Sequence, residues 1–152
     1  MAESKKNTYN SETKFFGLTI YTPQEIFISC NVKSVTIPSI LGTFQVLVNH
    51  APILTAISSG VVNIVDEKGE TITLFVENGI VEVKNNQVTF SIASVEKIED
   101  IKITDLEQLV NEANLALNQT DLKEATRINM NKKINLMKQK IKAVQNIHQQ
   151  EQ

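Results

Sequence analysis

Few residues in this sequence have side chains that could perform chemistry. The chain has two histidines, His50 and His148, and one cysteine, Cys30. These residues lie far apart and do not have the close spacing of zinc or iron ligands, so we expect no metal site. No serine stands in the strand-turn-helix context of a nucleophile elbow, which a hydrolytic triad with His50 as its base would require.

The glycines do not form a phosphate-binding loop. They are widely scattered and none precedes a Lys-Ser or Lys-Thr pair: Gly17, Gly42, Gly60, Gly69 and Gly79. A loop that cradles phosphates needs clustered glycines whose backbone N–H groups converge, followed by such a pair. We therefore expect a non-catalytic protein without a cofactor, whose function depends on contacts with other molecules.

The composition is that of a folded globular chain. Of 152 residues, 41% are hydrophobic and 21% are charged, and the net charge is −2, which gives no reason to expect nucleic acid as a partner. The charge is uneven along the chain, because residues 1–100 hold 7 basic and 11 acidic residues, whereas residues 101–152 hold 8 and 6. The C-terminal part therefore differs in character from the rest.

Residues 1–14 are polar and include Glu3 and Glu12, so they resemble neither a secretory signal nor a transit peptide. We expect them to form a disordered leader. No run approaches the roughly 18 apolar residues of a membrane helix, so any membrane association should go through partner proteins. Cys30 has no second cysteine to pair with, and we expect it to be a buried thiol.

Residues 15–95 are predicted to form a β domain. Short β-branched and aromatic runs alternate with turn residues, and no helical periodicity persists. This spacing is typical of an antiparallel sandwich or barrel. Asn78-Gly79 suits a tight hairpin turn between two of the strands. The predicted strands are residues 15–22, 25–29, 31–37, 43–48, 60–65, 71–77, 79–84 and 87–92.

The pattern changes after residue 95, where glycine and proline no longer occur. Apolar residues then recur at helical spacing, which predicts a linker over residues 96–103 and an antiparallel two-helix hairpin over residues 104–148. We expect helices at about 104–118 and 121–148. The first would carry an apolar stripe, and the second a seam facing it: Met130, Ile134, Met137, Ile141 and Val144.

Both predicted helices begin with a possible capping box. Thr104 precedes Glu107 by three residues, and Asp121 stands in the same relation to Glu124. The second helix also carries a basic run. From Arg127 to Lys142 there are six basic residues and no acidic one: Arg127, Lys132, Lys133, Lys138, Lys140 and Lys142. Such a run is either a solvated face or a surface that binds acidic groups.

Two segments resemble a known family. Residues 42–60 form a glycine-led strand that ends in His50-Ala51-Pro52 and continues to a Leu-Thr pair and Gly60. Residues 75–83 contain a turn glycine followed by a Glu-Val pattern. Together with the expected order of sandwich and helix hairpin, these segments resemble the epsilon subunits of F-type ATP synthases over about residues 15–148.

The resemblance implies a non-catalytic rotor subunit of the central stalk, which couples ion-driven rotation to ATP synthesis. It also implies that the sandwich contacts the gamma subunit and the membrane c-ring, and that the complex lies on the cytoplasmic face of a bacterial plasma membrane. The contact candidates are Gly42, Thr43, Phe44, His50, Ala51, Pro52 and Gly79. His50 could instead be a hydrogen-bonded packing residue.

In relatives the hairpin either lies on the sandwich or extends along gamma to the alpha and beta subunits, where it inhibits ATP hydrolysis. The resemblance implies that the basic residues from Arg127 to Lys142 would then face acidic loops. A helix pair with a narrow apolar seam can occupy two docking sites of similar free energy. We expect the same regulation in this chain.

This sequence departs from the family at several positions. Gln45 and Val48 stand where glycine and proline are usual, which suggests an altered loop. Some members bind ATP through an Ile/Leu-Asp-x-x-Arg-Ala motif, but here Lys102 replaces its aspartate and Asp105 its arginine. With Arg127 as the only arginine, bidentate phosphate recognition is also scarce, so we expect no nucleotide site.

A second interpretation is a free-standing β-sandwich binding module that dimerises through its helical tail. The sign that would distinguish it is a stable homodimer of the isolated protein through the seam from Met130 to Val144.

Overall fold

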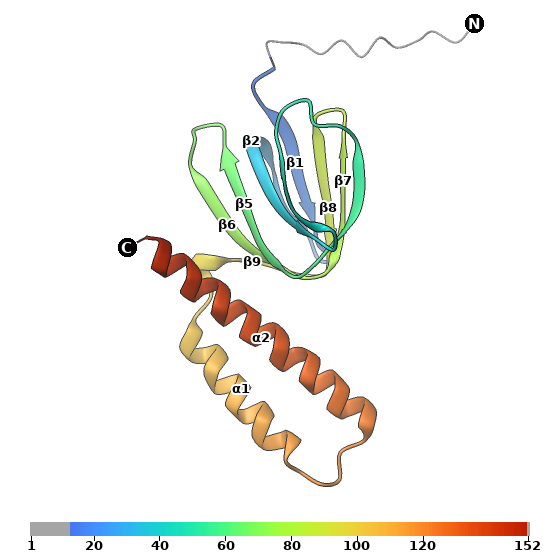
Figure 1. The fold of residues 1–152 in the computed structure, drawn as a ribbon, viewed down its shortest axis with the longest axis vertical. Helices are drawn as coiled ribbons and strands as arrows, with labels where there is room; N and C mark the ends of the chain where they lie inside the picture. The colour runs from blue at the N-terminus through green and yellow to red at the C-terminus, as the bar shows by residue number, and fades with distance from the viewer. Residues whose placement is uncertain (1–12, 152) are drawn as a thin grey trace, which may run out of the picture.

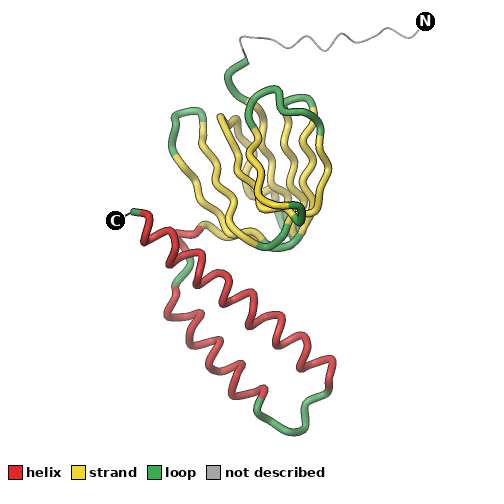
Figure 2. The backbone as a smooth tube through the Cα atoms, viewed as in Figure 1, coloured by secondary structure: helices red, strands yellow, loops and turns green. Residues whose placement is uncertain are grey.

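The computed structural model describes residues 13–151, and it consists of a β-sandwich followed by two helices (Figure 1). Figure 2 shows that the strands form one layered body and that the helical hairpin extends from one end of it, with the turn between the helices far from the sandwich. The predicted fold class is confirmed. The predicted leader, residues 1–14, lies outside the described residues except for Thr13 and Lys14.

Nine strands make up the sandwich. Their order across the sheet is β1-β8-β7-β4-β2-β5-β6-β9, with β3 paired to β2, and β1 also pairs with β2 so that the sheet closes on itself. Every pairing in the described part is antiparallel except β1 with β8. The strands are β1 (Phe16–Tyr21), β2 (Ile26–Ser39), β3 (Gly42–Val46), β4 (Ile53–Ile57), β5 (Gly60–Asp66), β6 (Thr71–Val76), β7 (Gly79–Lys84), β8 (Gln87–Ile92) and β9 (Val95–Lys97).

The sandwich core comes from alternating strand residues, as period-2 patterning requires. In β7, Val81 and Val83 are buried while Glu82 and Lys84 are exposed, and β8 alternates in the same way. Branched aliphatic side chains and Phe90 dominate the interior. Such a close-packed core makes the sandwich a stiff body.

Three strands differ from the prediction, and one of them, the short β9 at the start of the expected linker, was not predicted. The runs at 25–29 and 31–37 belong to one strand, β2, whose first half pairs with β1 and second half with β3 and β5. Strand β4 was not predicted either. Its residues are apolar on both sides, since Leu54 is exposed while Ile57 is buried, and this hides the alternation that identifies a half-buried strand.

The predicted hairpin turn at Asn78-Gly79 is wrong. Strands β6 and β7 do not pair with each other, because β6 pairs with β5 and β9 whereas β7 pairs with β4 and β8. The two residues therefore carry the chain from one layer to the other. Gly79 is needed for space, since a Cβ there would lie 2.3 Å from the backbone oxygen of Ser91.

The two helices are α1 (Ile103–Leu117) and α2 (Glu124–Gln150). Neither predicted capping box forms. Helix α1 follows Lys102 and α2 follows Lys123, and neither preceding residue caps its helix through its side chain. Ile103 packs into an apolar cluster between helices and sandwich, so α1 begins one residue before the expected Thr104. Tertiary packing therefore decides this helix start rather than local capping.

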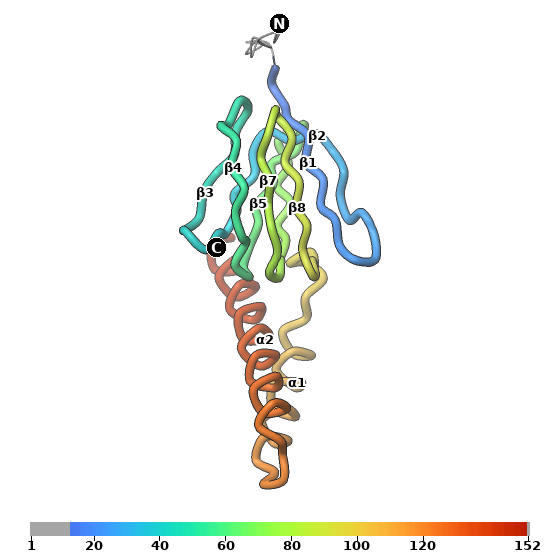
Figure 3. The backbone as a smooth tube through the Cα atoms, turned by 90° about the vertical axis from the view of Figure 1, so that its right-hand side faces the viewer, coloured from blue at the N-terminus to red at the C-terminus, as the bar shows by residue number. Residues whose placement is uncertain are grey.

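A second apolar cluster joins the helices to the sandwich. Phe75 on β6 is its centre, and Ala143 and Val144 of α2 pack with it. Residues 96–103, the expected linker, contain the end of β9, the 3-10 helix η1 (Ile98–Asp100) and the start of α1. Ile98 and Ile101 from this segment are buried in the cluster. The hairpin is therefore docked on the sandwich (Figure 3).

The predicted burial of Cys30 is wrong. Cys30 lies in β2 and is exposed, as are its neighbours Ser29 and Asn31. Partial desolvation, with smaller contributions from Asp66 and Glu67, raises the pKa of its thiol. No helix among residues 13–151 has both the length and the apolar character needed to cross a membrane.

Candidate functional site

His50 lies in the loop between β3 and β4. Figure 3 shows that this loop is at the end of the sandwich that points away from the helices. It is half-buried, and its backbone N–H donates to the Leu47 carbonyl at 3.2 Å. Its ring Nδ1 lies 2.6 Å from the Ala51 carbonyl, so an Nδ1–H tautomer donates to it. The Phe44 ring is 6.2 Å away between centroids. The imidazole is therefore held in a fixed orientation, with exposed Ala51 and Pro52 beside it.

A pair of asparagines anchors this loop to the neighbouring β7–β8 turn. The backbone N–H of Asn49 donates to Oδ1 of Asn86 at 2.7 Å, and Nδ2 of Asn86 donates to Oδ1 of Asn49 at 3.0 Å. Asn49, Asn85 and Asn86 all have positive φ angles, of 63°, 52° and 55°. Asparagine tolerates this region better than most residues, so these three positions do not need glycine. The loop is thus fixed before any partner binds.

Gly42 and Gly79 lie at the opposite end of the sandwich from His50. Gly42 pairs with Ser39, Ser39 pairs with Ile57, and Ile57 pairs with Gly79, so the four positions form one row. Gly42 has a φ of 116° in the turn between β2 and β3, where the Ser39 hydroxyl donates to its carbonyl at 2.6 Å. The seven contact candidates therefore do not form one surface.

Arg127 joins the two helices to each other. Its guanidinium donates to the Leu117 carbonyl at 3.0 Å and to the Gln119 carbonyl at 3.5 Å. These carbonyls belong to the C-terminal end of α1 and the turn after it, which lack partners within the helix. A cation at this place also interacts favourably with the helix dipole. Arg127 thus acts inside the hairpin in this conformation.

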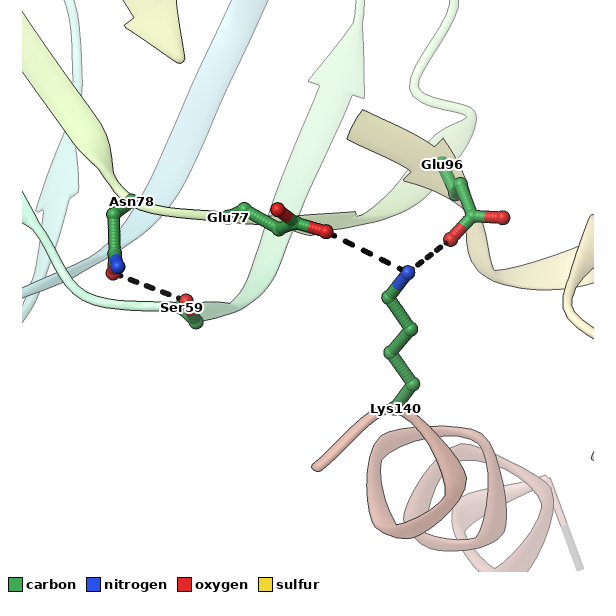
Figure 4. A network of polar contacts seen from close by, with 5 residues as sticks. All are labelled: Ser59, Glu77, Asn78, Glu96 and Lys140. Carbon is green, nitrogen blue, oxygen red and sulfur yellow. Dashed lines mark hydrogen bonds and ion pairs between the residues drawn. The ribbon is translucent and has the colours of Figure 1, made fainter. Parts of the chain in front are cut away.

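Lys140 points back to the sandwich, as Figure 4 shows. Its Nζ lies 2.7 Å from Oε2 of Glu96 on β9 and 3.7 Å from Oε1 of Glu77 after β6. Neither partner could be predicted, because Glu96 is 44 positions from Lys140 and no local sequence pattern connects the two residues. Lys140 therefore does not belong to an exposed basic face in the docked state.

The other four lysines of α2 are exposed. Lys132 and Lys133 line a groove of about 600 Å³ between α2 and the sandwich loops, together with Ser59 and Asn78. Lys138 and Lys142 are four positions apart and share another side of the helix, since successive residues turn by about 100°. The predicted basic run is therefore divided between two sides of α2.

The sandwich also has a group of exposed apolar side chains that was not predicted. Leu54 is 69% exposed and Ile80 is 53% exposed, and they project from the adjacent strands β4 and β7 on the same face. Ile40 and Leu41 lie in the turn next to β4, where the N–H of Ile40 donates to the Ala56 carbonyl. We call Ile40, Leu41, Leu54 and Ile80 the apolar patch. Exposed apolar side chains on one face are a candidate surface for a contact with another protein.

No three histidine, cysteine, aspartate or glutamate residues within 13–151 are grouped so that they could hold a metal ion. The segment compared with the nucleotide motif starts α1, with Lys102 just before the helix and Asp105 in its first turn. Asp105 would repel a phosphate at this N-terminus.

The chain is a β-sandwich protein with a C-terminal helix pair docked on it. Its exposed apolar side chains, ordered loop and lysines suit contacts with other proteins. The sequence model described as "ATP synthase, Delta/Epsilon chain, beta-sandwich domain" matches residues 15–98. The chloroplastic ATP synthase epsilon chain of Pisum sativum is 30% identical over 129 residues, covering 85% of this chain and 93% of that one. The chain therefore belongs to the ATP synthase epsilon-chain family.

Other relatives agree with this assignment. The ATP synthase epsilon chain of Clostridium perfringens is 41% identical over 86 residues, which are 57% of this chain and 65% of that one. Thus the match spans less than two thirds of that relative. A chain in the mitochondrial ATP synthase of Euglena gracilis has the same fold, with a TM-score of 0.68, 18% identity, and coverage of 92% of this chain and 83% of that one.

Proposed function

We propose that this chain is the epsilon subunit of the central stalk of an F-type ATP synthase. It performs no catalysis itself and transmits ion-driven rotation as part of the rotor. The observation that carries this proposal is the order of elements within one family-matched chain, a closed sandwich followed by a helix pair docked on one of its ends. The complex would lie on the cytoplasmic face of a bacterial plasma membrane, and this subunit would reach the membrane only through its partners.

The sandwich offers two surfaces for the two expected partners. The His50 loop lies at the end opposite the helices and is fixed by the Asn49–Asn86 pair, so it suits the polar loops of the c-ring. The apolar patch lies on the side of the sandwich and suits burial against the gamma subunit. A stiff body between two such contacts can transmit torque, because a close-packed core deforms little.

The helix pair is proposed to regulate hydrolysis. In the docked state α2 meets the sandwich through a small apolar cluster centred on Phe75 and through Lys140. Release would allow α2 to extend along gamma toward the alpha and beta subunits, where its exposed lysines could meet acidic loops. A free-energy difference of about 1.4 kcal/mol between the two positions changes their ratio tenfold.

The homodimer interpretation is less well supported. Ile134 and Val144 of the predicted seam are buried within the chain, at 4% and 2% exposure, and α1 packs beside α2. A dimer through this seam would have to displace α1 first.

Removing residues 121–152 is expected to raise ATP hydrolysis by the assembled complex severalfold, because α2 would no longer block rotation in that direction. Steady-state hydrolysis by the purified complex measures this. Since the deletion also exposes the apolar side of α1, Lys138→Glu with Lys142→Glu is the second variant, and Lys84→Glu on the sandwich is its control. Unchanged inhibition in both helix variants would refute the regulatory role.

A further inference from the structure

The contact between the helices and the sandwich contains a lysine, Lys140, whose side chain is largely covered. Within residues 13–151 the salt bridges are those that Lys140 makes with Glu96 and Glu77. Its side chain is only 14% exposed, and Nζ lies 5.8 Å from the centroid of the Phe75 ring. Partial burial of this kind reduces the screening by solvent that makes most surface ion pairs weak.

Both carboxylates are held by the sandwich rather than by mobile segments. Glu96 belongs to β9 and pairs in register with Phe75 of β6, and Glu77 directly follows β6 and donates its backbone N–H to the Ser94 carbonyl. The two acids therefore lie close together at the pair of strands β6 and β9, where Phe75 is directly opposite Glu96 and two positions before Glu77. Without Lys140 their charges would face each other unbalanced.

The apolar part of the docked contact on α2 is small. Val144 is its buried aliphatic side chain, Ala143 contributes a single methyl group, and Leu136 and Ile147 are only partly buried. Because hydrophobic stabilisation scales with the area removed from water, these residues leave a modest driving force for docking. The charged contact of Lys140 is therefore a substantial share of what holds α2 in place.

We propose that Lys140 is an ionic latch that sets how often the helix pair leaves the sandwich. This inference rests on the proposed regulation by the helices, which it deepens by naming the contact. In the docked state Nζ is shared between Glu96 and Glu77, and release transfers Lys140 to the set of exposed lysines on α2. The same residue thus holds the docked state and adds charge to the released one.

The latch can be measured on the purified full-length chain by the reaction of a buried thiol. Ala143→Cys places the thiol between α2 and the sandwich, and Cys30→Ser removes the exposed native thiol. The rate of modification by a thiol reagent then reports opening of the contact, even when the open form is rare. Val62→Cys in the same background reports opening of the sandwich core.

Lys140→Met keeps the aliphatic stem and removes the charge, and we expect it to raise the reaction rate at position 143 by about three- to tenfold. Glu96→Gln should raise the rate severalfold and Glu77→Gln less, in the order of their distances to Nζ. Lys142→Met is the matched control, since position 142 is turned away from position 140 and should leave the rate unchanged. Added salt should raise the rate in the parent far more than in Lys140→Met.

Equal rates in Lys140→Met and Lys142→Met would overturn the latch, and so would a rise at position 62 that matches the rise at position 143. Neither measurement requires a partner. A latch found in a chain that binds no stalk subunit would refute the proposed function alone. If the helices inhibit hydrolysis in the complex but the thiol at position 143 reacts no faster in Lys140→Met than in the parent, the latch alone would be refuted.

Discussion

Replacing Phe75 by alanine is expected to lower the free energy of unfolding by about 3–5 kcal/mol, the usual cost of removing a fully buried phenylalanine ring. Phe75 is 2% exposed and is the largest side chain of the cluster that joins helices and sandwich. The substitution removes the apolar platform under Ala143 and Val144 as well as the ring beside Lys140. The loss should therefore include the apolar part of the free energy of docking. Urea denaturation followed by circular dichroism measures it.

Phe44→Ala is the matched control for this prediction. Phe44 is only half-buried at the margin of the sandwich core and does not contact the helices, so its removal should cost much less. The thiol at position 143 should also react much faster in Phe75→Ala and normally in Phe44→Ala. Equal losses of stability in the two variants would contradict the central place of Phe75.

Substituting Gly79 by alanine is expected to cost about 2–4 kcal/mol, because the new Cβ would lie 2.3 Å from a backbone oxygen and 2.7 Å from the Cα of Ile92. Neither atom can move without separating β7 from β8. Gly79→Asn should be at least as harmful, since the problem is space and not the φ angle. Thermal unfolding of the purified variants measures both effects.

Gly42 gives the opposite comparison. A Cβ at Gly42 would meet no atom within 4 Å, but the φ angle of 116° strains any side chain. Gly42→Ala should therefore cost about 1 kcal/mol. Equal losses at Gly42 and Gly79 would contradict the explanation from close strand approach.

Much of the fold could be predicted because apolar residues recur at the strand period in most strands and at the helical period in the helices. The alternation of Val81 and Val83 with polar neighbours locates β7, and the spacing of Ile134, Ile141 and Val144 locates the inner side of α2. Strand β4 lacks such a signal because its exposed and its core-facing residues are both apolar. The start of α1 also could not be read locally, since the packing of Ile103 overrides the cap expected at Thr104.

The site was less predictable, for a related reason. The basic residues of α2 could be identified from the sequence, but the partner of each side chain depends on what the helix packs against. Arg127 turns to the end of α1, and Lys140 turns to carboxylates that the chain brings together only after the sandwich forms. The contact roles of His50 and its neighbours, and of the exposed lysines, remain predictions.

The most direct test of the stalk assignment is a pull-down of the tagged chain from its native membranes in mild detergent, with mass spectrometry of the retained proteins. We expect to recover the gamma subunit and the c-ring together with alpha and beta. Leu54→Glu with Ile80→Glu should abolish this recovery while leaving the fold intact, because both side chains are exposed. A homodimer without any of these subunits would contradict the assignment.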